Sequence, residues 1–263
     1  MRTRFAGRSD QEVAEMLSEL SRFRDTVLDN ARLRPGETVV DVGAGTGLLT
    51  IAAADQVAPD GDVLAVDVSV DALEELRRIC AAPNIFYLVG SAEVLPMTNE
   101  SVDVVLTRSV LIYVQDKAEA ACEFFRVLRS GGRISIFEPI NSGNTRLSES
   151  VDFGDLGEQL SEWERASYED PDDPMLNFDE DDLQHIFRDA GFNDVSGKLD
   201  PGESEMPGDR MLTAVGAPGR LALLDVWAKV FPEDVVERLA AAVRTAGTVR
   251  RAWPQLYLTA TKP

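Results

Sequence analysis

The chain has 263 residues, of which 44% are hydrophobic and 27% charged, a composition typical of a soluble globular protein of one domain. Its formal net charge of −20 repels the phosphates of nucleic acids and anionic membranes, which disfavours both as partners. No apolar run reaches the roughly 20 residues that a membrane span needs. The basic segment Met1–Gly7 lacks the apolar stretch of a signal peptide, so a cytoplasmic protein is predicted.

The two cysteines, Cys80 and Cys122, fall within predicted helices on opposite sides of two predicted strands. We therefore expect reduced core cysteines rather than a disulfide. A C-x-x-C pair is absent from the sequence, and no metal site is predicted.

The first predicted elements are a helix over Asp10–Leu33 and a buried strand that includes Val39 and Val40. The strand ends at Asp41 and leads into the glycine loop Val42-Gly43-Ala44-Gly45-Thr46-Gly47. Glycines allow a backbone to approach a ligand closely, and the amides at the following helix start supply hydrogen-bond donors. The segment therefore predicts a ligand-binding loop between a strand and a helix.

The details of this loop indicate the kind of ligand. A dinucleotide fold needs a third glycine where this chain has Leu48, and Asp41 would repel a pyrophosphate. Asp41 would instead attract an ammonium group, so S-adenosylmethionine is favoured, with a nicotinamide cofactor as the alternative.

The second predicted strand, Val63–Val68, carries Asp67 near its end, where a carboxylate can accept hydrogen bonds from both hydroxyls of a ribose. The alternative is that Asp67 caps the helix that starts near Val70. Ser69 suits that cap better, so the ribose role is favoured.

The alternation of strands and helices continues to residue 139. A strand at Ile85–Val89 leads into the loop Gly90–Pro96, and a strand at Ser101–Arg108 precedes a helix at Asp116–Leu128 and a strand at Ile134–Pro139. This order predicts an α/β fold with a doubly wound, mostly parallel sheet and helices on both faces. Asp41, Asp67, Ser91 and Arg108 fall at predicted strand ends, where ligands of such sheets bind.

These motifs resemble those of the class I S-adenosylmethionine-dependent methyltransferases. The first loop is similar to the family pattern hhDhGxGxG, Gly90–Pro96 is similar to GDAxxLPF with Ser91 in place of Asp, and Arg126–Gly132 is similar to RVLkPGG. The resemblance is strong over about residues 20–140 and weaker at Asp179–Val195 and Gln255–Lys262. It implies a seven-stranded Rossmann-like sheet, S-adenosyl-L-methionine as cofactor, and the following cofactor-binding residues: Asp41, Gly43, Ala44, Gly45, Asp67, Val68, Ser91, Ala92, Glu93 and Arg108.

The resemblance also implies a division of the single domain 1–263. Residues 1–34 would form a helical lid over the cofactor, and residues 35–139 the cofactor-binding core. The stretches 140–178 and 201–250 would be insertions that shape the substrate pocket, the second with helices at Arg220–Val230 and Glu233–Thr245.

The charge is concentrated in residues 149–182, which hold 14 acidic side chains against one basic side chain. A predicted helix at Gln159–Tyr168 could bind a substrate through Glu158, Glu162 or Glu164, with Trp163 and Tyr168 as walls of the pocket. The alternative is a solvated acidic face over ordinary core aromatics. If the acids bind substrate, the acceptor carries an amine or guanidinium group.

No motif identifies a catalytic base. The weak candidates are Glu138, Tyr113 and Tyr168, whereas His185 lies in the predicted helix Asp179–Ala190, which in this family is away from the transferred methyl group. Methyl transfer from a sulfonium depends largely on aligning the reactants and excluding water, so a base is not obligatory.

The sequence thus predicts a methyltransferase that acts on a small molecule, such as an amine or guanidino compound. The alternatives are a sterol, quinone or polyketide O- or C-methyltransferase with an apolar pocket, and a cofactor-binding pseudo-enzyme with a regulatory or scaffold role. The oligomeric state stays open, with a homodimer as one option.

Overall fold

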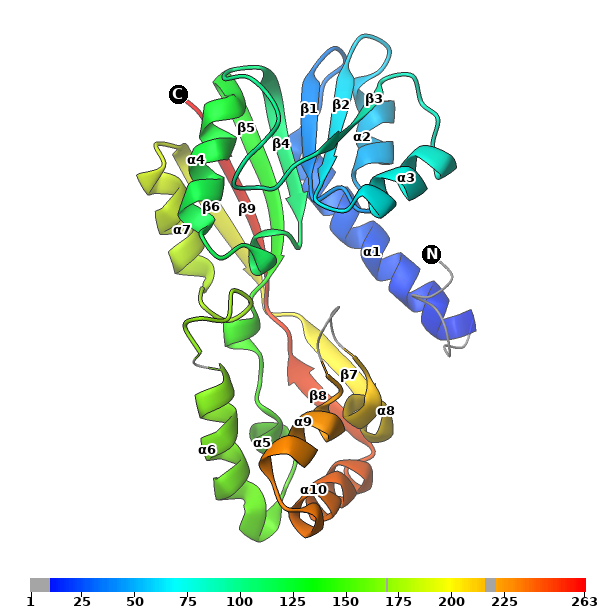
Figure 1. The fold of residues 1–263 in the computed structure, drawn as a ribbon, viewed down its shortest axis with the longest axis vertical. Coiled ribbons are helices and arrows are strands. Elements are labelled where there is room, and N and C mark those ends of the chain that lie inside the picture. Colours follow the sequence, from blue (N-terminus) through cyan, green and yellow to red (C-terminus); the bar gives the residue numbers. More distant parts are fainter. Residues whose placement is uncertain (1–9, 169, 216–220) are drawn as a thin grey trace. The chain divides into compact units, whose positions relative to one another are not determined.

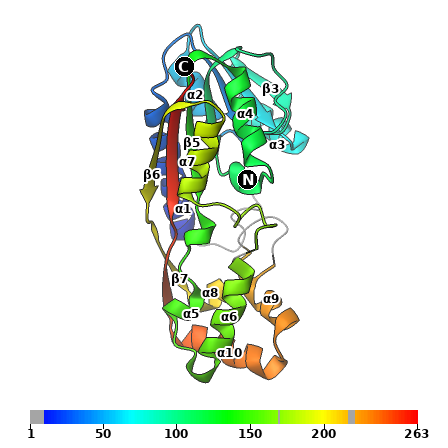
Figure 2. The same cartoon turned by 90° about the vertical axis from the view of Figure 1, so that its left-hand side faces the viewer.

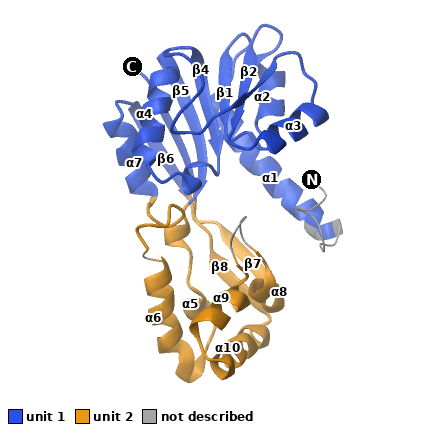
Figure 3. Cartoon of the chain, viewed as in Figure 1, with its two compact units in different colours: residues 1–139, 180–199, 256–263 blue, residues 140–179, 200–255 orange. Residues whose placement is uncertain are grey.

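The structure, a computed structural model, describes residues 10–168, 170–215 and 221–263. The chain forms two compact units, shown in blue and orange in Figure 3. Unit 1 comprises residues 1–139, 180–199 and 256–263, and unit 2 comprises residues 140–179 and 200–255. Several predicted segments fall partly or wholly outside the described residues. They are the N-terminal segment Met1–Gly7, the start of the lid at residues 1–9, the start of the helix at Arg220, and parts of the insertions 140–178 and 201–250.

Unit 1 contains a seven-stranded sheet in the order β3-β2-β1-β4-β5-β9-β6 (Figure 1). Its strands are β1 Thr38–Val42, β2 Asp62–Asp67, β3 Ile85–Val89, β4 Val102–Arg108, β5 Leu128–Pro139, β6 Asn193–Asp200 and β9 Gln255–Thr261. Strands β1 to β5 pair in parallel, with Val40 of β1 opposite Leu64 of β2 and Val105 of β4. The predicted doubly wound, mostly parallel fold is confirmed.

Strand β9 runs against its neighbour β5. Near one end, the Gly131 N–H donates to the Lys262 carbonyl at 2.9 Å, and at the other end the Ile140 N–H donates to the Pro254 carbonyl at 2.9 Å. The start of β5 therefore lies beside the end of β9. The five parallel strands β1 to β5 end at one edge, which is where ligands of such sheets bind.

The helices of unit 1 are α1 Asp10–Ala31, α2 Thr50–Val57, α3 Val70–Ile79, α4 Lys117–Val127 and α7 Glu180–Asp189, and they cover both faces of the sheet (Figure 2). Two predicted helix starts carry side-chain caps. Ser69 accepts a hydrogen bond from the Ala72 N–H at 3.2 Å, and Asp116 accepts one from the Glu119 N–H at 2.9 Å. Such caps satisfy amides that have no partner within the helix.

Helix α1 is held on the sheet through its second half. The Ser135 hydroxyl of β5 donates to the Val27 carbonyl at 2.7 Å, and the Phe23 and Phe137 rings pack with centroids 4.5 Å apart. The Arg133 guanidinium binds the carbonyls of Ala31 and Arg32, where the helix ends. These contacts stabilise the carboxyl-terminal half of α1 on β5.

Unit 2 brings together the two stretches that the sequence indicated as insertions. Its elements are α5 Leu147–Ser150, α6 Gly157–Tyr168, α8 Gly208–Thr213, α9 Leu223–Val230, α10 Glu233–Thr245 and an antiparallel pair of strands, β7 Glu203–Pro207 and β8 Thr248–Ala252. Short 3-10 turns lie at Asn141–Gly143 and Gly154–Leu156 in unit 2, and at Leu111–Tyr113 in unit 1. Leu160, Trp227 and Leu239 share one hydrophobic core with residues from both stretches, so the stretches fold together.

The prediction of core cysteines is wrong for Cys122, which is exposed on α4, and Cys80 is only half-buried at the end of α3. Both are free thiols. Helical periodicity places a residue on a helix but does not say which face the sheet covers. Within the described residues, no helix is long and apolar enough to cross a bilayer.

Candidate cofactor-binding and active site

The glycine loop after β1 is compact at its ends and open in its middle. A Cβ atom on Gly43 would lie 2.3 Å from a methyl carbon of Val110, and one on Gly47 would lie 2.2 Å from a methyl carbon of Leu76. At Gly45 the nearest atom to such a Cβ is 4.0 Å away. All three glycines have positive φ, which other residues rarely adopt. The loop therefore leaves room for a ligand at Gly45.

Asp41 lies at the base of this loop and is almost fully buried. Its carboxylate accepts a hydrogen bond from the Thr50 hydroxyl at 2.5 Å. Burial raises the pKa of Asp41 to about 7, although the bond from Thr50 acts in the opposite direction. Near neutral pH Asp41 therefore carries only part of the full negative charge that the sequence argument assumed. Sequence reasoning missed Thr50, which comes nine residues later at the start of α2.

A cavity of about 680 Å³ opens beside the loop. It is lined by Asp41, Gly43, Ala44 and Arg108 of the predicted cofactor set, and by Leu17, Leu20, Ser21 and Arg24 of α1. Gly45, Asp67, Val68, Ser91, Ala92 and Glu93 are not among its lining residues. Its size is in the range of small-molecule and cofactor sites. The mixed apolar and polar walls fit a small-molecule ligand, while the lid role of α1 stays a prediction.

Asp67, at the end of β2, joins the loop to the next helix. One carboxylate oxygen accepts from the Gly45 N–H at 2.7 Å, and the other accepts from the Ser69 N–H at 2.8 Å. The cap of α3 is made by the Ser69 hydroxyl and not by Asp67. Asp67 thus fixes the open part of the glycine loop, and its contact with a ribose stays a prediction.

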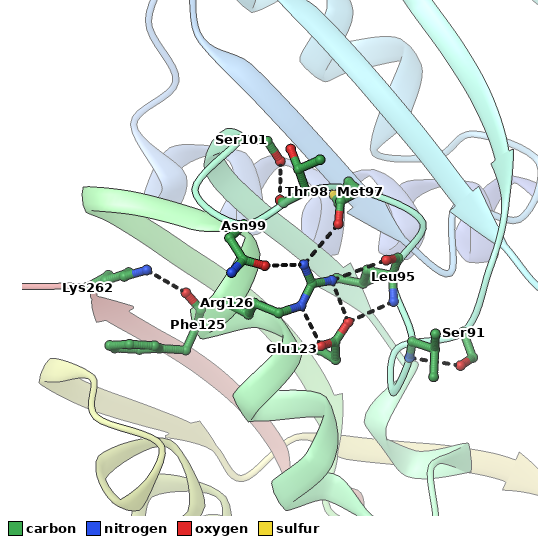
Figure 4. Close-up of polar contacts among 11 residues, drawn as sticks. Ser91, Leu95, Met97, Thr98, Asn99, Ser101, Glu123, Phe125, Arg126 and Lys262 are labelled. Carbon is green, nitrogen blue, oxygen red and sulfur yellow. Dashed lines mark hydrogen bonds and ion pairs between the residues drawn. The ribbon is translucent and has the colours of Figure 1, made fainter.

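The loop Gly90–Pro96 is held from α4, as Figure 4 shows. The Arg126 guanidinium donates to the Leu95 and Met97 carbonyls at 3.2 and 2.9 Å and binds both oxygens of Glu123. Glu123 in turn accepts from the Leu95 N–H at 2.9 Å, and its bond with Arg126 lowers the pKa of its carboxyl. This clamp, which sequence reasoning missed, fixes the segment that the resemblance assigns to the adenine.

Within that loop, the Ser91 hydroxyl accepts from the Val94 N–H at 3.2 Å. Ala92 is buried, Glu93 is half-buried, and Val68 after β2 is exposed. The individual adenine contacts of these residues stay predictions.

The end of β4 and the end of β5 meet next to the glycine loop. The Arg108 guanidinium lies 5.6 Å from the Phe23 ring centroid and 5.7 Å from that of Phe137. Glu138 is fully buried and accepts hydrogen bonds from the N–H groups of Val110, Leu111 and Ile112 at 2.8, 2.9 and 3.1 Å.

Burial raises the pKa of Glu138 to about 7, and the three N–H groups and Arg108 oppose this rise. Both oxygens of Glu138 are occupied by backbone, so its catalytic role stays a prediction with no contact to support it. The side chain of Tyr113, another candidate base, is exposed at the end of the 3-10 turn.

In unit 2, the predicted acidic face of α6 is only partly present. Glu158 and Glu162 are exposed, but Glu164 is buried and accepts from the N–H groups of Leu147 and Ser148 at 2.8 and 3.0 Å. The inclusion of Glu164 in a substrate-facing acidic surface is therefore wrong, because its carboxylate caps α5.

The predicted aromatic walls of unit 2 have neighbours of their own. Trp163 is half-buried and packs edge-on against Phe231, with ring centroids 5.8 Å apart. The Tyr168 hydroxyl accepts from Arg251 at 3.3 Å, and the Arg146 guanidinium lies 5.6 Å from the Tyr168 ring centroid. His185 is exposed on α7 of unit 1. The described part of the chain holds no cluster of three or more metal-ligating side chains.

Most of the known proteins that are similar to this chain are named as methyltransferases. The sequence profile of a family described as "Methyltransferase domain" matches residues 40–136. The chain is 36% identical over 115 residues to an arsenite methyltransferase of Halobacterium salinarum, a match that covers 43% of this chain and 29% of that protein. It spans only about a third of the length of the first two curated relatives.

A longer match is to the ubiquinone/menaquinone biosynthesis C-methyltransferase UbiE of Cronobacter sakazakii, at 30% identity over 181 residues, or 64% of this chain and 71% of that protein. Among solved structures, phosphoethanolamine N-methyltransferase 2 of Haemonchus contortus, in complex with S-adenosyl-L-methionine, is similar with a TM-score of 0.54. It is 16% identical, and the match covers 92% of this chain and 52% of that one, which establishes the shared fold.

Proposed function

Because the chain belongs to the class I S-adenosylmethionine-dependent methyltransferases, we propose that it methylates a small molecule with an apolar body, which unit 2 selects. The cofactor supplies a methyl group activated by a sulfonium. The residues of this chain that would hold it are Asp41, Gly43, Gly45, Asp67 and the Gly90–Pro96 loop. The observation that carries the choice of acceptor is that many acidic side chains of unit 2 already have partners within the unit.

Several acids of unit 2 bind neighbouring groups. Glu164 caps α5, Asp155 pairs with Arg238, and Glu149 accepts a hydrogen bond from the Arg146 N–H at 3.2 Å. Carboxylates that are engaged in this way contribute little to a site for a cation. The acidic charge of residues 149–182 is therefore a weaker argument for an amine or guanidinium acceptor than the sequence alone indicated.

The side chains proposed as pocket walls also favour an uncharged acceptor. Trp163 belongs to the margin of an apolar core that includes Trp227 and Phe231. Tyr168 has the guanidinium groups of Arg146 and Arg251 as neighbours, which would repel a cation. The name of the UbiE relative, a C-methyltransferase of quinone biosynthesis, is in line with an apolar acceptor.

The position of unit 2 in the chain supports a role in selecting the acceptor. The chain enters unit 2 at Ile140, directly after β5 ends at Pro139. Ligands of doubly wound sheets bind outside the carboxyl ends of the strands, and specificity in shared folds lies in such additions.

The test is a methyl-transfer screen against quinols, phenols, keto acids and amines, with detection of a product heavier by one methyl group and of S-adenosylhomocysteine. We expect turnover with a quinol or phenol. Turnover with amines alone would overturn the proposed acceptor. Cofactor binding without turnover on any acceptor or on a metabolite extract would favour the cofactor-binding pseudo-enzyme.

An amine acceptor remains the second candidate because Glu158 and Glu162 are exposed on α6. If they bind a cation, the double variant Glu158→Gln/Glu162→Gln should raise the KM for an amine about two- to fivefold, the range for exposed ion pairs. The effect should shrink as salt rises, since exposed charges are screened over about 8–10 Å. The control is Glu233→Gln/Asp234→Asn, which neutralises two exposed acids of α10.

A further inference from the structure

Glu138 organises the turn that follows β4. Its fully buried carboxylate accepts hydrogen bonds from three consecutive N–H groups, those of Val110, Leu111 and Ile112. The turn begins at Ser109, which has a φ of +55° and donates its N–H to the Phe137 carbonyl at 2.8 Å. One carboxylate of β5 thus fixes the path of the chain as it leaves β4.

The burial of the Glu138 carboxylate and the positive φ of Ser109 both cost free energy. A carboxylate removed from water is unfavourable unless its oxygens are hydrogen-bonded, and the neighbouring Leu111 and Ile112 are themselves buried and apolar. A non-glycine residue in the left-handed region is uncommon, and such residues persist where the surrounding structure determines them, often at functional sites. An alanine or leucine at position 138 would avoid the buried charge but would leave the three N–H groups without this acceptor, so the path of the turn depends on the carboxylate.

Val110 is the residue through which this turn meets the glycine loop. Its N–H is held by Glu138, and its side chain fills the space that a Cβ atom on Gly43 would need. Gly43 in turn donates its N–H to the Val66 carbonyl at 2.8 Å, at the end of β2. A shift of Val110 would therefore change the support beneath the loop that lines the cavity.

We propose that Glu138 is a positioning residue, which holds Val110 against Gly43 and so sets the affinity of the glycine loop for S-adenosylmethionine. Glu138 acts through the turn and supplies no proton in the reaction. The inference depends on cofactor binding alone and is independent of the acceptor.

The buried carboxylate of unit 2 provides a matched control. Glu164 is also buried and also accepts hydrogen bonds from consecutive backbone N–H groups, those of Leu147 and Ser148. Glutamine at either position keeps the size of the side chain but places an amide donor toward a backbone donor. Both variants, Glu138→Gln and Glu164→Gln, should lower the thermal midpoint of unfolding.

Calorimetric titration with S-adenosylhomocysteine distinguishes the two variants by their affinity for the cofactor product. Glu138→Gln should raise the dissociation constant about tenfold, or 1.4 kcal/mol, whereas Glu164→Gln should leave it within about twofold of wild type. An unchanged affinity in Glu138→Gln, or an equal loss in both variants, would overturn the proposal.

Two further measurements keep the test decisive if Glu138→Gln fails to fold. Val110→Ala leaves the carboxylate in place but removes the contact with Gly43, and it should weaken binding about threefold. In hydrogen exchange, S-adenosylhomocysteine should slow the amides of the segment from Asp41 to Leu49 in wild type and Glu164→Gln, and less so in Val110→Ala. Wild-type affinity and protection in Val110→Ala would contradict the proposal.

Discussion

The two units use buried carboxylates for different ends. In unit 1, Asp41 lies near the end of β1, at the base of the glycine loop. Glu138 lies near the end of β5 and binds the turn that packs on this loop. In unit 2, Glu164 lies between two helices and caps one of them. A buried acid thus supports the glycine loop and the turn beside it in unit 1, and helix packing in unit 2. The contacts of each acid, and not its burial, distinguish the two roles.

The variant Trp227→Ala, for which we expect the greatest loss of stability, tests whether the two units are energetically separate. Trp227 is fully buried in a core made only of unit 2 residues, so Trp227→Ala should cost about 3–5 kcal/mol of unfolding free energy. Affinity for S-adenosylhomocysteine should stay within about twofold, because independent sites act separately to about 0.5 kcal/mol. Denaturant unfolding and calorimetry measure the two quantities.

The control for this variant is Phe124→Ala, which removes an equally buried ring from unit 1. It should lower both the unfolding free energy and the cofactor affinity. Loss of cofactor binding in Trp227→Ala would show that unit 1 depends on unit 2 for its fold.

A second prediction concerns Asp67, which binds the backbone of the glycine loop. Asp67→Ala should weaken binding of S-adenosylmethionine by about 1.5–3 kcal/mol, the range for hydrogen bonds to a charged group. Asp71→Ala, which removes an exposed acid four residues later, should leave the affinity unchanged. Unchanged affinity in Asp67→Ala together with a sharp fall in melting temperature would make Asp67 a structural residue only.

A third prediction follows from the raised pKa of Asp41, about 7 against 3.8 for an unperturbed carboxyl. Between these pH values the folded state binds a proton more tightly than the unfolded state, so this group makes stability fall as pH rises from about 4 to 7. Asp41→Asn removes the buried charge and should raise the unfolding free energy at pH 8 by about 1–3 kcal/mol, with no gain near pH 4.

If Asp41 binds the ammonium group of the cofactor, as the sequence predicts, the same variant should also weaken cofactor binding. Thr50→Val is the contrasting change, since it keeps the carboxylate but removes its hydrogen bond, and it should lower stability at pH 8. Urea unfolding at pH 5 and pH 8 distinguishes the two variants. A fall in stability at pH 8 in Asp41→Asn would contradict the raised pKa.

The smallest expected effect is at His185, an exposed residue of α7. His185→Ala should change the unfolding free energy by no more than about 0.5 kcal/mol, as at ordinary surface positions. Turnover with an acceptor from the screen should stay within tenfold of wild type. A loss of about 10²–10⁴-fold would indicate a general base and would reverse this assignment.

The order of strands and helices in the predicted cofactor-binding core could be predicted from the amino-acid pattern alone. The strand Ile85–Val89 and the helix Glu233–Thr245 have the bounds that the pattern predicted, and Ser69 caps its helix as expected. These features depend on periodicity and on side chains within three or four residues of the groups they bind.

The contacts between distant segments could not be predicted from the sequence, because they depend on how the chain folds. Glu138 binds amides 26 to 28 residues earlier, Glu164 caps a helix that begins 17 residues earlier, and Arg126 clamps a loop about 30 residues away. The pairing of β7 with β8, in which only Val249 is buried, was not predicted from the sequence pattern. Sequence patterns show which side of a helix or strand is apolar. The partner of a buried charge instead depends on which elements the fold brings side by side.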